Sequence, residues 1–505
     1  MGRFILSIDQ GTTGSTAALF NTDGSLVGQA GLDFRQIYPK PGWVEHDPED
    51  IWKSVTSTIE QVMAQARIGS KDLHAIGITN QRETLVVWDR ETGRPIHNAI
   101  VWQCRRTTEF CQNLKKKGAE SLIRKKTGLV IDPYFTASKL RWILDHVDGA
   151  KARAAQGRLA FGTIDSFLLW RLTAGKEHAT DVSNASRTQL MNIHKGDWDP
   201  QLLKLFGVPE TVLPEIRASS GVFGETRGLH FLEDGIPIAG IAGDQQSALF
   251  GQACFKQGEA KCTYGTGSFL LVNSGKKAPN PKSGVLATVA WKLQGDKHLT
   301  YALEGSAFIC GAAVQWLRDG LGLIGASSEI EELARQVHGT DGVEFVPALT
   351  GLGAPYWDPE ARGAIVGLTR GATKAHLARA TLEGMALQNV DLLLAMQKDL
   401  GKKIGVLKVD GGASANNLLM QMQSDYLGTK LVRPSQIETT AAGAAYLAGL
   451  GSGLWKNTEE IQDIWRKDRE FQPAIDNATR KKRLMDWRLA VSRTLVNKVD
   501  KRAKL

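Results

Sequence analysis

The sequence has few cysteines, no long hydrophobic run and none of the common nucleotide-binding consensus motifs. Its five cysteines in 505 residues include no Cys-x-x-Cys pair, so neither a disulfide framework nor a zinc site is expected. No stretch approaches the roughly 18 apolar residues of a membrane-spanning helix, and the N-terminus does not resemble a signal peptide. We therefore expect a cytoplasmic protein with reduced thiols and no membrane span.

Three familiar classes of nucleotide-binding protein are also excluded. The Gly-x-x-x-x-Gly-Lys-Ser/Thr motif of P-loop proteins is absent, no Gly-x-Gly-x-x-Gly follows a predicted strand, and the protein-kinase signatures are missing.

Predicted strands and helices alternate along the chain, which indicates an α/β protein. Because 505 residues exceed what a single core organises, we expect two domains, residues 1–250 and 251–505.

Positive charge is concentrated at one end of the chain. The net charge is +9, and residues 478–505 contain ten Lys or Arg against two Asp. Apolar residues recur there at helical spacing, including Leu484, Trp487 and Val491, which predicts a docked terminal helix with a basic outer face. Binding of nucleic acid or of a membrane surface is the minor alternative, and we expect no nucleic-acid partner.

A glycine- and threonine-rich turn follows the first predicted strand. Asp9 stands before this turn, whose potential phosphate-binding residues are Thr12, Thr13, Gly14 and Thr16. Exposed N–H groups and hydroxyls suit phosphate oxygens, and a carboxylate suits Mg²⁺, although an ordinary glycine-rich hairpin would have the same composition. A second such hairpin, Tyr264 to Ser268, occurs some 250 residues later. The repetition favours a duplicated ATPase that uses ATP and Mg²⁺.

A third segment resembles a nucleoside site. Residues 407–409 end a predicted strand, Gly411 and Gly412 permit close backbone approach, and Asn416 can begin the next helix.

Polar side chains also follow predicted strands at positions that suit a small hydroxylated acceptor. They are Arg82, Glu83, Tyr134, Asp244 and Gln245. Considered singly, Arg82 and Glu83 could be surface charge, and Asp244 could be a helix N-cap. Together they predict a kinase in which Asp244 is the general base and Asp9 the Mg²⁺ partner. Trp102 and Phe269 are either apolar walls of this site or core residues.

Eight segments carry a resemblance to a known family over nearly the whole chain. They are residues 9–13, 38–48, 77–84, 101–106, 134–146, 243–246, 264–267 and 363–383. In these segments the chain resembles the FGGY family of carbohydrate kinases, and specifically its glycerol-phosphorylating branch. The resemblance implies two ribonuclease-H-like domains, as in actin-like ATPases, around a central cleft. It also implies ATP-dependent phosphorylation of glycerol to sn-glycerol 3-phosphate, with Mg²⁺ as cofactor, and a homodimer or homotetramer.

The resemblance assigns the candidate residues to two ligands. Glycerol is assigned to Arg82, Glu83, Tyr134, Asp244 and Gln245, with Trp102 and Phe269 as the apolar wall. ATP or ADP is assigned to Thr12, Thr13, Thr266, Gly311, Gln315, Gly412 and Asn416. Many relatives have Ser-Ser-Arg where this chain has Gly14-Ser15-Thr16, which puts the arginine's contribution to ADP binding in doubt.

One regulatory contact is also implied. His230, followed by Phe231, resembles a histidine phosphorylated by the carrier protein of the sugar phosphotransfer system, although an ordinary surface histidine is the alternative. Two functional alternatives are kept: a kinase for another small polyol or ketose, and a non-metabolic actin-like ATPase. The second would have no use for an acceptor site.

Overall fold

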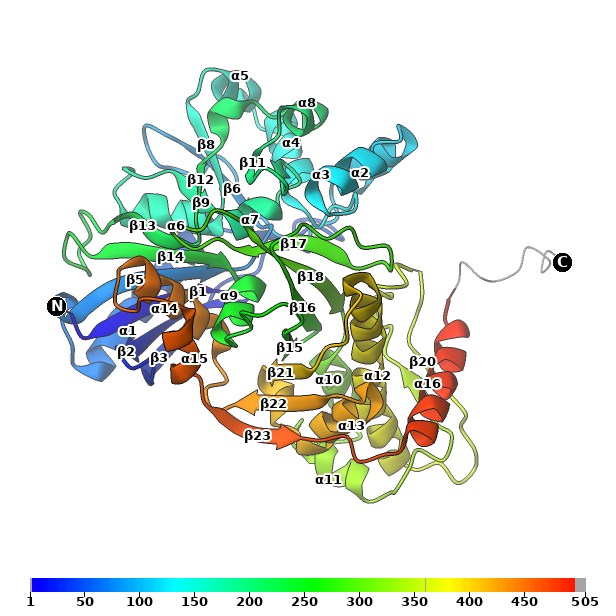
Figure 1. Cartoon of the computed structure of the whole chain (residues 1–505). Helices are drawn as coiled ribbons and strands as arrows, with labels where there is room; N and C mark the ends of the chain where they lie inside the picture. Colours follow the sequence, from blue (N-terminus) through cyan, green and yellow to red (C-terminus); the bar gives the residue numbers. More distant parts are fainter. Residues whose placement is uncertain (1, 359, 496–505) are drawn as a thin grey trace.

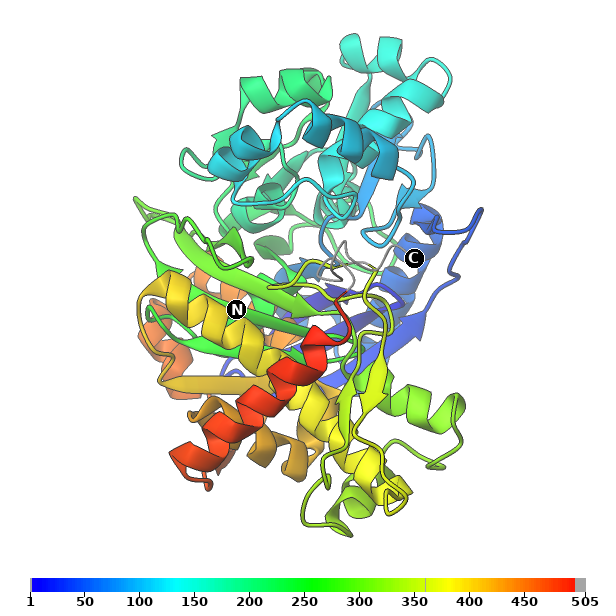
Figure 2. The same cartoon turned by 90° about the vertical axis from the view of Figure 1, so that its right-hand side faces the viewer.

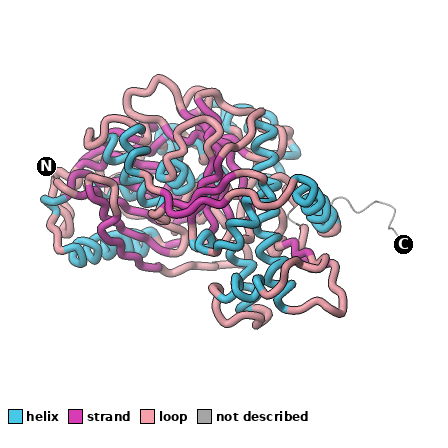
Figure 3. The backbone as a smooth tube through the Cα atoms, turned by 60° about the horizontal axis from the view of Figure 1, so that its bottom comes forward, coloured by secondary structure: helices cyan, strands magenta, loops and turns pink. Residues whose placement is uncertain are grey.

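The computed structural model describes residues 2–358 and 360–495 as a mixed α/β protein built on two large sheets. Helices lie around the strands, which run through the middle of the molecule (Figure 3). The predicted α/β class is therefore confirmed. No helix in the described part of the chain is long and apolar enough to cross a membrane.

The first sheet has six strands in the order β13-β14-β5-β1-β2-β3. They are β1 (Phe4–Gln10), β2 (Gly14–Asn21), β3 (Leu26–Asp33), β5 (Leu73–Asn80), β13 (Ser220–Glu225) and β14 (Pro237–Gly243). Strand β1 is antiparallel to β2 and parallel to β5, which is in turn parallel to β14. The carboxyl ends of β1, β5 and β14 therefore meet at one edge.

The second sheet has seven strands in the order β17-β18-β16-β15-β21-β22-β23. They are β15 (Ala260–Tyr264), β16 (Ser268–Gly275), β17 (Leu286–Trp291), β18 (Thr300–Ala307), β21 (Val406–Asp410), β22 (Lys430–Pro434) and β23 (Lys467–Phe471). Strand β15 is antiparallel to β16 and parallel to β21, and β21 is parallel to β22. A hairpin followed by two parallel strands thus occurs twice, which confirms the predicted duplication.

Both faces of the first sheet are covered by helices. Ile5 packs in one buried cluster and Leu6 and Ile8 in another, because successive side chains of a strand point to opposite faces. The covering helices are α1 (Pro48–Ala66) and α6 (Ile164–Leu172) on one face, and α9 (Asp244–Gly251) and α14 (Thr439–Gly451) on the other. Helix α1 begins after the N-cap Asp47, whose carboxylate accepts from the Glu49 N–H at 2.9 Å.

Helix α14 crosses from the second half of the chain to the first sheet, where it lies beside β1, β5 and α9 (Figure 1). Ten of its thirteen residues are Ala, Gly or Thr, and the approach is close: a Cβ on Gly77 of β5 would collide with the Ala444 backbone. Small residues on both sides are therefore required at this crossing. The predicted division near residue 250 remains a prediction, and α14 lies on the first half's sheet.

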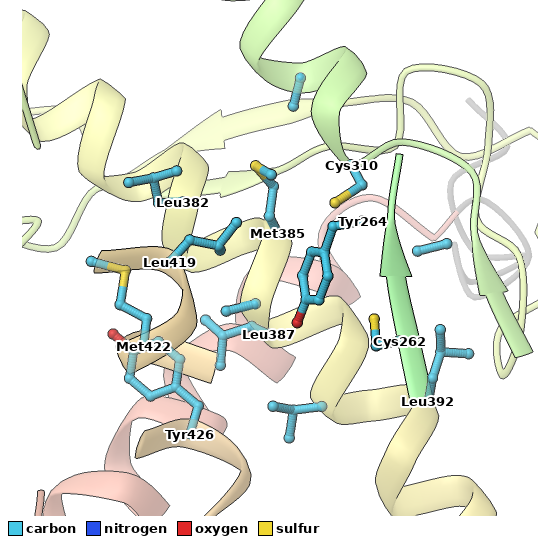
Figure 4. Close-up of a cluster of buried hydrophobic side chains, with 14 of the residues drawn as sticks. Cys262, Tyr264, Cys310, Leu382, Met385, Leu387, Leu392, Leu419, Met422 and Tyr426 are labelled. Atoms are coloured by element: carbon cyan, nitrogen blue, oxygen red, sulfur yellow. The ribbon is translucent and has the colours of Figure 1, made fainter. Parts of the chain in front are cut away.

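The second sheet is covered by α10 (Gly311–Asp319), α11 (Glu329–Arg335), α12 (Lys374–Leu400) and α13 (Asn417–Leu427). Figure 4 shows Tyr264 at the end of β15 facing the side chains of α12 and α13. Its hydroxyl donates to Gln423 Oε1 at 2.8 Å, which satisfies the only polar atom of that buried ring.

The remaining elements form an upper region and small attachments (Figure 1). The additional strands are β4 (Glu45–His46), β6 (Leu85–Asp89), β7 (Ala99–Ile100), β8 (Leu159–Thr163), β9 (Ala179–Asp181), β10 (Met191–Asn192), β11 (Asp197–Trp198), β12 (Glu215–Arg217), β19 (Glu344–Val346) and β20 (Ala364–Val366). The additional helices are α2 (Thr108–Lys116), α3 (Glu120–Thr127), α4 (Thr136–His146), α5 (Ala150–Ala155), α7 (Val182–Ser186), α8 (Pro200–Phe206), α15 (Thr458–Ile464) and α16 (Asn477–Ser492).

The predicted terminal helix is confirmed as α16, drawn in red in Figure 2. Leu484, Trp487 and Val491 are buried, as predicted, in the hydrophobic core between the second sheet and its helices, while Lys481 and Lys482 face solvent. The basic residues after Leu495 lie outside the described part of the chain.

Candidate active site

The first predicted phosphate hairpin joins β1 to β2. The Gly11 N–H donates to the Gly14 carbonyl at 2.9 Å, so residues 11–13 form a tight turn with Thr13 exposed. Packing alone requires glycine at position 14, because a Cβ there would lie 2.6 Å from Asp33 Oδ1 on β3. Thr16 lies further along β2, opposite Asp9 in the β1–β2 ladder. The predicted hairpin geometry is confirmed, while phosphate binding stays a prediction.

The second predicted hairpin joins β15 to β16 and also holds the start of α10. The Gly265 N–H donates to the Gly267 carbonyl at 2.9 Å. The Gly311 N–H donates to the Gly265 carbonyl at 2.9 Å, and a Cβ on Gly311 would approach that oxygen to 2.7 Å. Thr266 and Gln315, one turn into α10, are both exposed. The structure therefore brings Thr266, Gly311 and Gln315 to one place.

The third predicted segment reaches the same place from β21. Gly411 has a φ of 82°, and a Cβ there would lie 2.7 Å from the Tyr264 carbonyl oxygen, so only glycine fits. Gly412 is exposed beside it. Asn416 caps α13, its Oδ1 accepting from the Leu419 N–H at 2.9 Å. Asn416 therefore begins the helix as predicted.

The predicted acceptor residues gather at the carboxyl ends of β5 and β14. These strands pair in parallel, with Asn80 opposite Gly243, so the loop after each strand begins at the same level. Arg82 Nε lies 3.1 Å from Asp244 Oδ1. Helix α9 starts at Asp244 with Gly243 as its N-cap, and Asp244 Oδ1 accepts from the Gln245 N–H at 2.6 Å in the first turn, so the capping alternative stays open. The same carboxylate oxygen also faces Arg82.

Arg82 belongs to a buried network of four charges. Its guanidinium contacts Glu304 on β18 at 2.5 and 3.0 Å. Arg187, directly after α7, contacts Glu83 at 2.6 Å and Glu304 at 3.0 Å. Burial would raise the pKa of Glu304, but the Arg187 and Arg82 guanidinium groups outweigh it and hold the pKa at about 2. Burial raises the pKa of Glu83 above its usual range despite Arg187 and Arg82.

The two aromatic candidates lie in different surroundings. Trp102 packs edge-on against Tyr134 with ring centroids 5.5 Å apart, and its Nε1 donates to Thr12 Oγ1 at 3.0 Å. The ring thus touches residues assigned to glycerol and to the nucleotide at once. Phe269 is half-buried on β16, paired with Thr263 and Ser306. Burial raises the pKa of Tyr134, so its phenol remains a hydrogen-bond donor.

Gln245 is held from the second half of the chain. Its Oε1 accepts from Lys261 Nζ, which also donates to Thr263 Oγ1 at 2.8 Å. Burial lowers the pKa of Lys261, opposed by the carboxylates of Asp410 and Asp244. Gln245 therefore presents its amide nitrogen as the group left for a ligand.

Asp9 has the electrostatic environment of a cation ligand. Burial, together with the carboxylates of Asp244 and Glu438, raises its pKa to about 8. Among the described residues no three His, Cys, Asp or Glu side chains form a complete metal site. Mg²⁺ is commonly held by one or two carboxylates together with water and substrate phosphates, and the Asp9 carboxylate is a donor of that kind.

Three partners in this region were not predicted: Glu304, Arg187 and Lys261. Glu304 carried a signal, because it is the one charged residue in the otherwise apolar and small strand β18, and such residues are rarely buried without a partner. Lys261 carried the same signal, since it is the one charged residue of β15, whereas Arg187 carried none that separates it from a surface cation.

His230 lies apart from this site, between β13 and β14. Its side chain is 81 % exposed and its Nε2 lies 3.9 Å from Glu60 Oε1. Phosphorylation by a carrier protein stays a prediction.

Comparison with known proteins gives consistent matches over nearly the whole chain. Residues 4–251 match the N-terminal domain of the FGGY family of carbohydrate kinases, and residues 260–452 match its C-terminal domain. The chain is 61 % identical over 493 residues to the glycerol kinase of Bdellovibrio bacteriovorus, covering 98 % of this chain and 99 % of that protein. It is 56 % identical over 495 residues to the glycerol kinase of Caldanaerobacter subterraneus, with 98 % and 99 % coverage.

Solved structures agree. Plasmodium falciparum glycerol kinase with ADP superposes with a TM-score of 0.92 at 38 % identity, and 98 % of each chain is covered. A ligand-bound xylulose kinase from Lactobacillus acidophilus has the same fold, with a TM-score of 0.86 at 23 % identity and 97 % of each chain covered.

Proposed function

The chain belongs to the FGGY family of carbohydrate kinases, and from this membership we propose that it transfers the terminal phosphoryl group of ATP to glycerol. The product is sn-glycerol 3-phosphate, and the enzyme is a phosphotransferase with an alcohol group as acceptor. The main support for a glycerol site here is that Arg82, Glu83 and Asp244 lie together at the carboxyl ends of the paired strands β5 and β14.

Asp244 is the general base of the proposed reaction. It accepts the proton of the attacking glycerol hydroxyl, whose oxygen then bonds to the γ-phosphorus as the bond to the ADP oxygen breaks. Arg82, held by Glu304 and touching Asp244, keeps this carboxylate oriented. Phosphoryl transfer asks mainly for such positioning, because the protein itself makes no covalent bond.

Glycerol is uncharged and offers three hydroxyls, so its recognition rests on hydrogen bonds. Glu83 accepts, Tyr134 and the Gln245 amide donate, and Arg82 donates to the same ligand. Trp102 and Phe269 form the apolar wall that excludes water, since water would otherwise compete for the phosphoryl group.

ATP lies along the two hairpins and the β21 loop in this proposal. Its phosphates meet Thr12, Thr13, Gly14, Thr16 and Thr266, and its nucleoside meets Gly311, Gln315, Gly412 and Asn416. Asp9 holds Mg²⁺, directly or through water, and its raised pKa is the observation that supports this role. When bound, the ion neutralises charge on the phosphates.

The enzyme is proposed to work in the cytoplasm as a homodimer or homotetramer. All five cysteines are free and buried, which fits a reducing compartment. On α16, Met485 and Leu489 are 67 % and 56 % exposed, which suits a contact between copies.

The activity is tested by measuring ADP release with glycerol, dihydroxyacetone, xylulose and gluconate, each with ATP and Mg²⁺. Glycerol should give the highest kcat/KM. A larger kcat/KM with a ketose or with gluconate would mean that the enzyme acts on that class of substrate and not on glycerol.

A further inference from the structure

A second concave site lies where the two halves of the chain meet. It is a cavity of about 420 Å³ between the β10–β11 hairpin, the segment around β12, and the β17–β18 hairpin of the second sheet. None of the residues assigned above to glycerol, ATP or Mg²⁺ lines it. Its size falls within the usual range for small-molecule sites.

The rim of this cavity is strongly basic. Lys195, Lys276, Lys277, Lys292 and Lys297 line it with Arg217 and two histidines, and no Asp or Glu is among its lining residues. Arg217 is neutralised by Glu215 at 2.7 Å and Glu177 at 2.9 Å.

None of the five lysines forms an ion pair with any residue of 2–358 or 360–495. Outside residues 478–505 the chain is nearly neutral, so this rim is a local excess of positive charge. Gathered ammonium groups repel one another and attract a multiply charged anion.

Part of the lining is apolar, and the walls are joined by hydrogen bonds. Val182 belongs to a buried cluster, and the half-buried Ile216 and Leu299 pack against that cluster and also line the cavity. The Tyr301 hydroxyl donates to the Ile193 carbonyl at 2.7 Å, and the Ser219 N–H donates to the Lys292 carbonyl at 2.7 Å. Each bond joins the first half of the chain to the second, so the cavity is formed before any ligand arrives.

We propose that this cavity binds a small organic anion that carries at least two phosphate or carboxylate groups. The lysines meet the charged groups as flexible point charges. The apolar part of the lining, at Val182, Ile216 and Leu299, meets the carbon body, which distinguishes the expected ligand from an inorganic ion. A macromolecular anion would contact a broad surface and would not require a concave site.

A ligand in this cavity could affect the active site through helix α7, which contacts both. Helix α7 begins with Val182 in the cavity lining, and the next residue, Ser183, accepts from the Gly243 N–H at 2.9 Å beside Asp244. Directly after the helix, Arg187 holds Glu83. An anion that presses on α7 would therefore change the glycerol site, a step that rests on the proposed function.

The test is calorimetric titration of the full chain with 2,3-bisphosphoglycerate, in the presence of saturating ADP, Mg²⁺ and glycerol so that the active site is filled. The cavity variant is Lys276→Gln/Lys277→Gln/Lys297→Gln. The matched control, Lys115→Gln/Lys116→Gln/Lys117→Gln, removes the same charge from exposed positions at and after the end of α2. Sulfate at equal ionic strength measures screening alone.

We expect the cavity variant to bind at least about tenfold more weakly than wild type and the control variant to bind like wild type. The anion should also change the glycerol KM at least about twofold in wild type and not in the cavity variant. Equal binding by both variants, or a response reproduced by sulfate, would overturn the site, and binding without a change in KM would overturn the route through α7. Glycerol phosphorylation without the anion should be normal in both variants, which separates this result from a failure of the proposed function.

Discussion

Arg82 and Glu304 form a two-point ion pair that joins the two large sheets. Arg82 follows β5 of the first sheet, Glu304 lies in β18 of the second, and their N–O distances are 2.5 and 3.0 Å. The side chains are only 2 % and 3 % exposed. Removing one partner of such a pair leaves an uncompensated buried charge, which is far more costly than the net contribution of the intact pair.

Glu304→Gln keeps the shape of the side chain and removes its charge. The two buried guanidinium groups of Arg82 and Arg187 would then lose the carboxylate that both of them contact. We therefore expect the free energy of unfolding to fall by about 3–5 kcal/mol. The glycerol KM should rise because Arg82 loses its fixed orientation, while ADP affinity changes little. Thermal unfolding, steady-state kinetics and ADP titration measure the three quantities.

Glu304→Asp is the matched control, because it retains the charge on a shorter side chain and should recover part of both losses. A Glu304→Gln protein with unchanged unfolding and unchanged glycerol KM would mean that Asp244 alone positions Arg82.

Asp244→Asn should lower kcat by about 10²–10⁴-fold, the usual range for a lost general base. Folding and ATP affinity should be retained, because Arg82 keeps its contact with Glu304. Single-turnover measurements of ADP formation separate the chemical step from product release. Asp47→Asn is the control, since Asp47 also stands at a helix start and asparagine caps equally well. Near-normal turnover of Asp244→Asn would remove the residue from the mechanism.

Glu83→Gln should weaken glycerol binding and leave ATP binding almost unchanged. The variant cannot accept as strongly from a hydroxyl, and it leaves Arg187 with only Glu304, so we expect a loss of about 1–3 kcal/mol or more in glycerol affinity. Titrations with each ligand measure this split. Glu91→Gln, an exposed position on the same domain, is the control. An equal weakening of both ligands would make Glu83 a structural residue.

The phosphate hairpins and strand-end loops could be predicted because their signals are local. A strand followed by Gly and Thr, as at Asp9 and at Tyr264, specifies a turn whatever the rest of the chain does. Parallel pairing of β5 and β14 then brings Arg82 and Asp244 together, because loops after parallel strands share an edge.

The partners of these residues could not be predicted. Glu304 lies 222 residues from Arg82, and no local pattern encodes which buried cation meets which anion. The position of helix α14 could not be predicted either. Its Ala- and Gly-rich sequence predicts a buried helix, but only the structure shows that it packs on the sheet of the first half, where the Ala444 backbone approaches Gly77 closely.

Asp165 gives a prediction for the pH dependence of stability. Burial raises the pKa of this carboxyl to about 7, despite hydrogen bonds from Thr163 at 2.5 Å and Thr180 at 2.7 Å. A raised pKa means that the folded protein holds the proton more tightly than the unfolded chain. The resulting stabilisation is complete below about pH 4 and is lost as the pH rises through about 7.

Asp165→Asn is neutral at every pH and should not suffer this loss. Between pH 4 and pH 8 its free energy of unfolding should rise relative to wild type by up to about 4 kcal/mol, the equivalent of some three pKa units. Urea unfolding at four pH values measures the difference, with exposed Asp463→Asn as the control that should follow wild type. Parallel curves for Asp165→Asn and wild type would contradict the prediction. They would mean that the two threonine hydroxyls stabilise the Asp165 carboxylate enough to offset its burial.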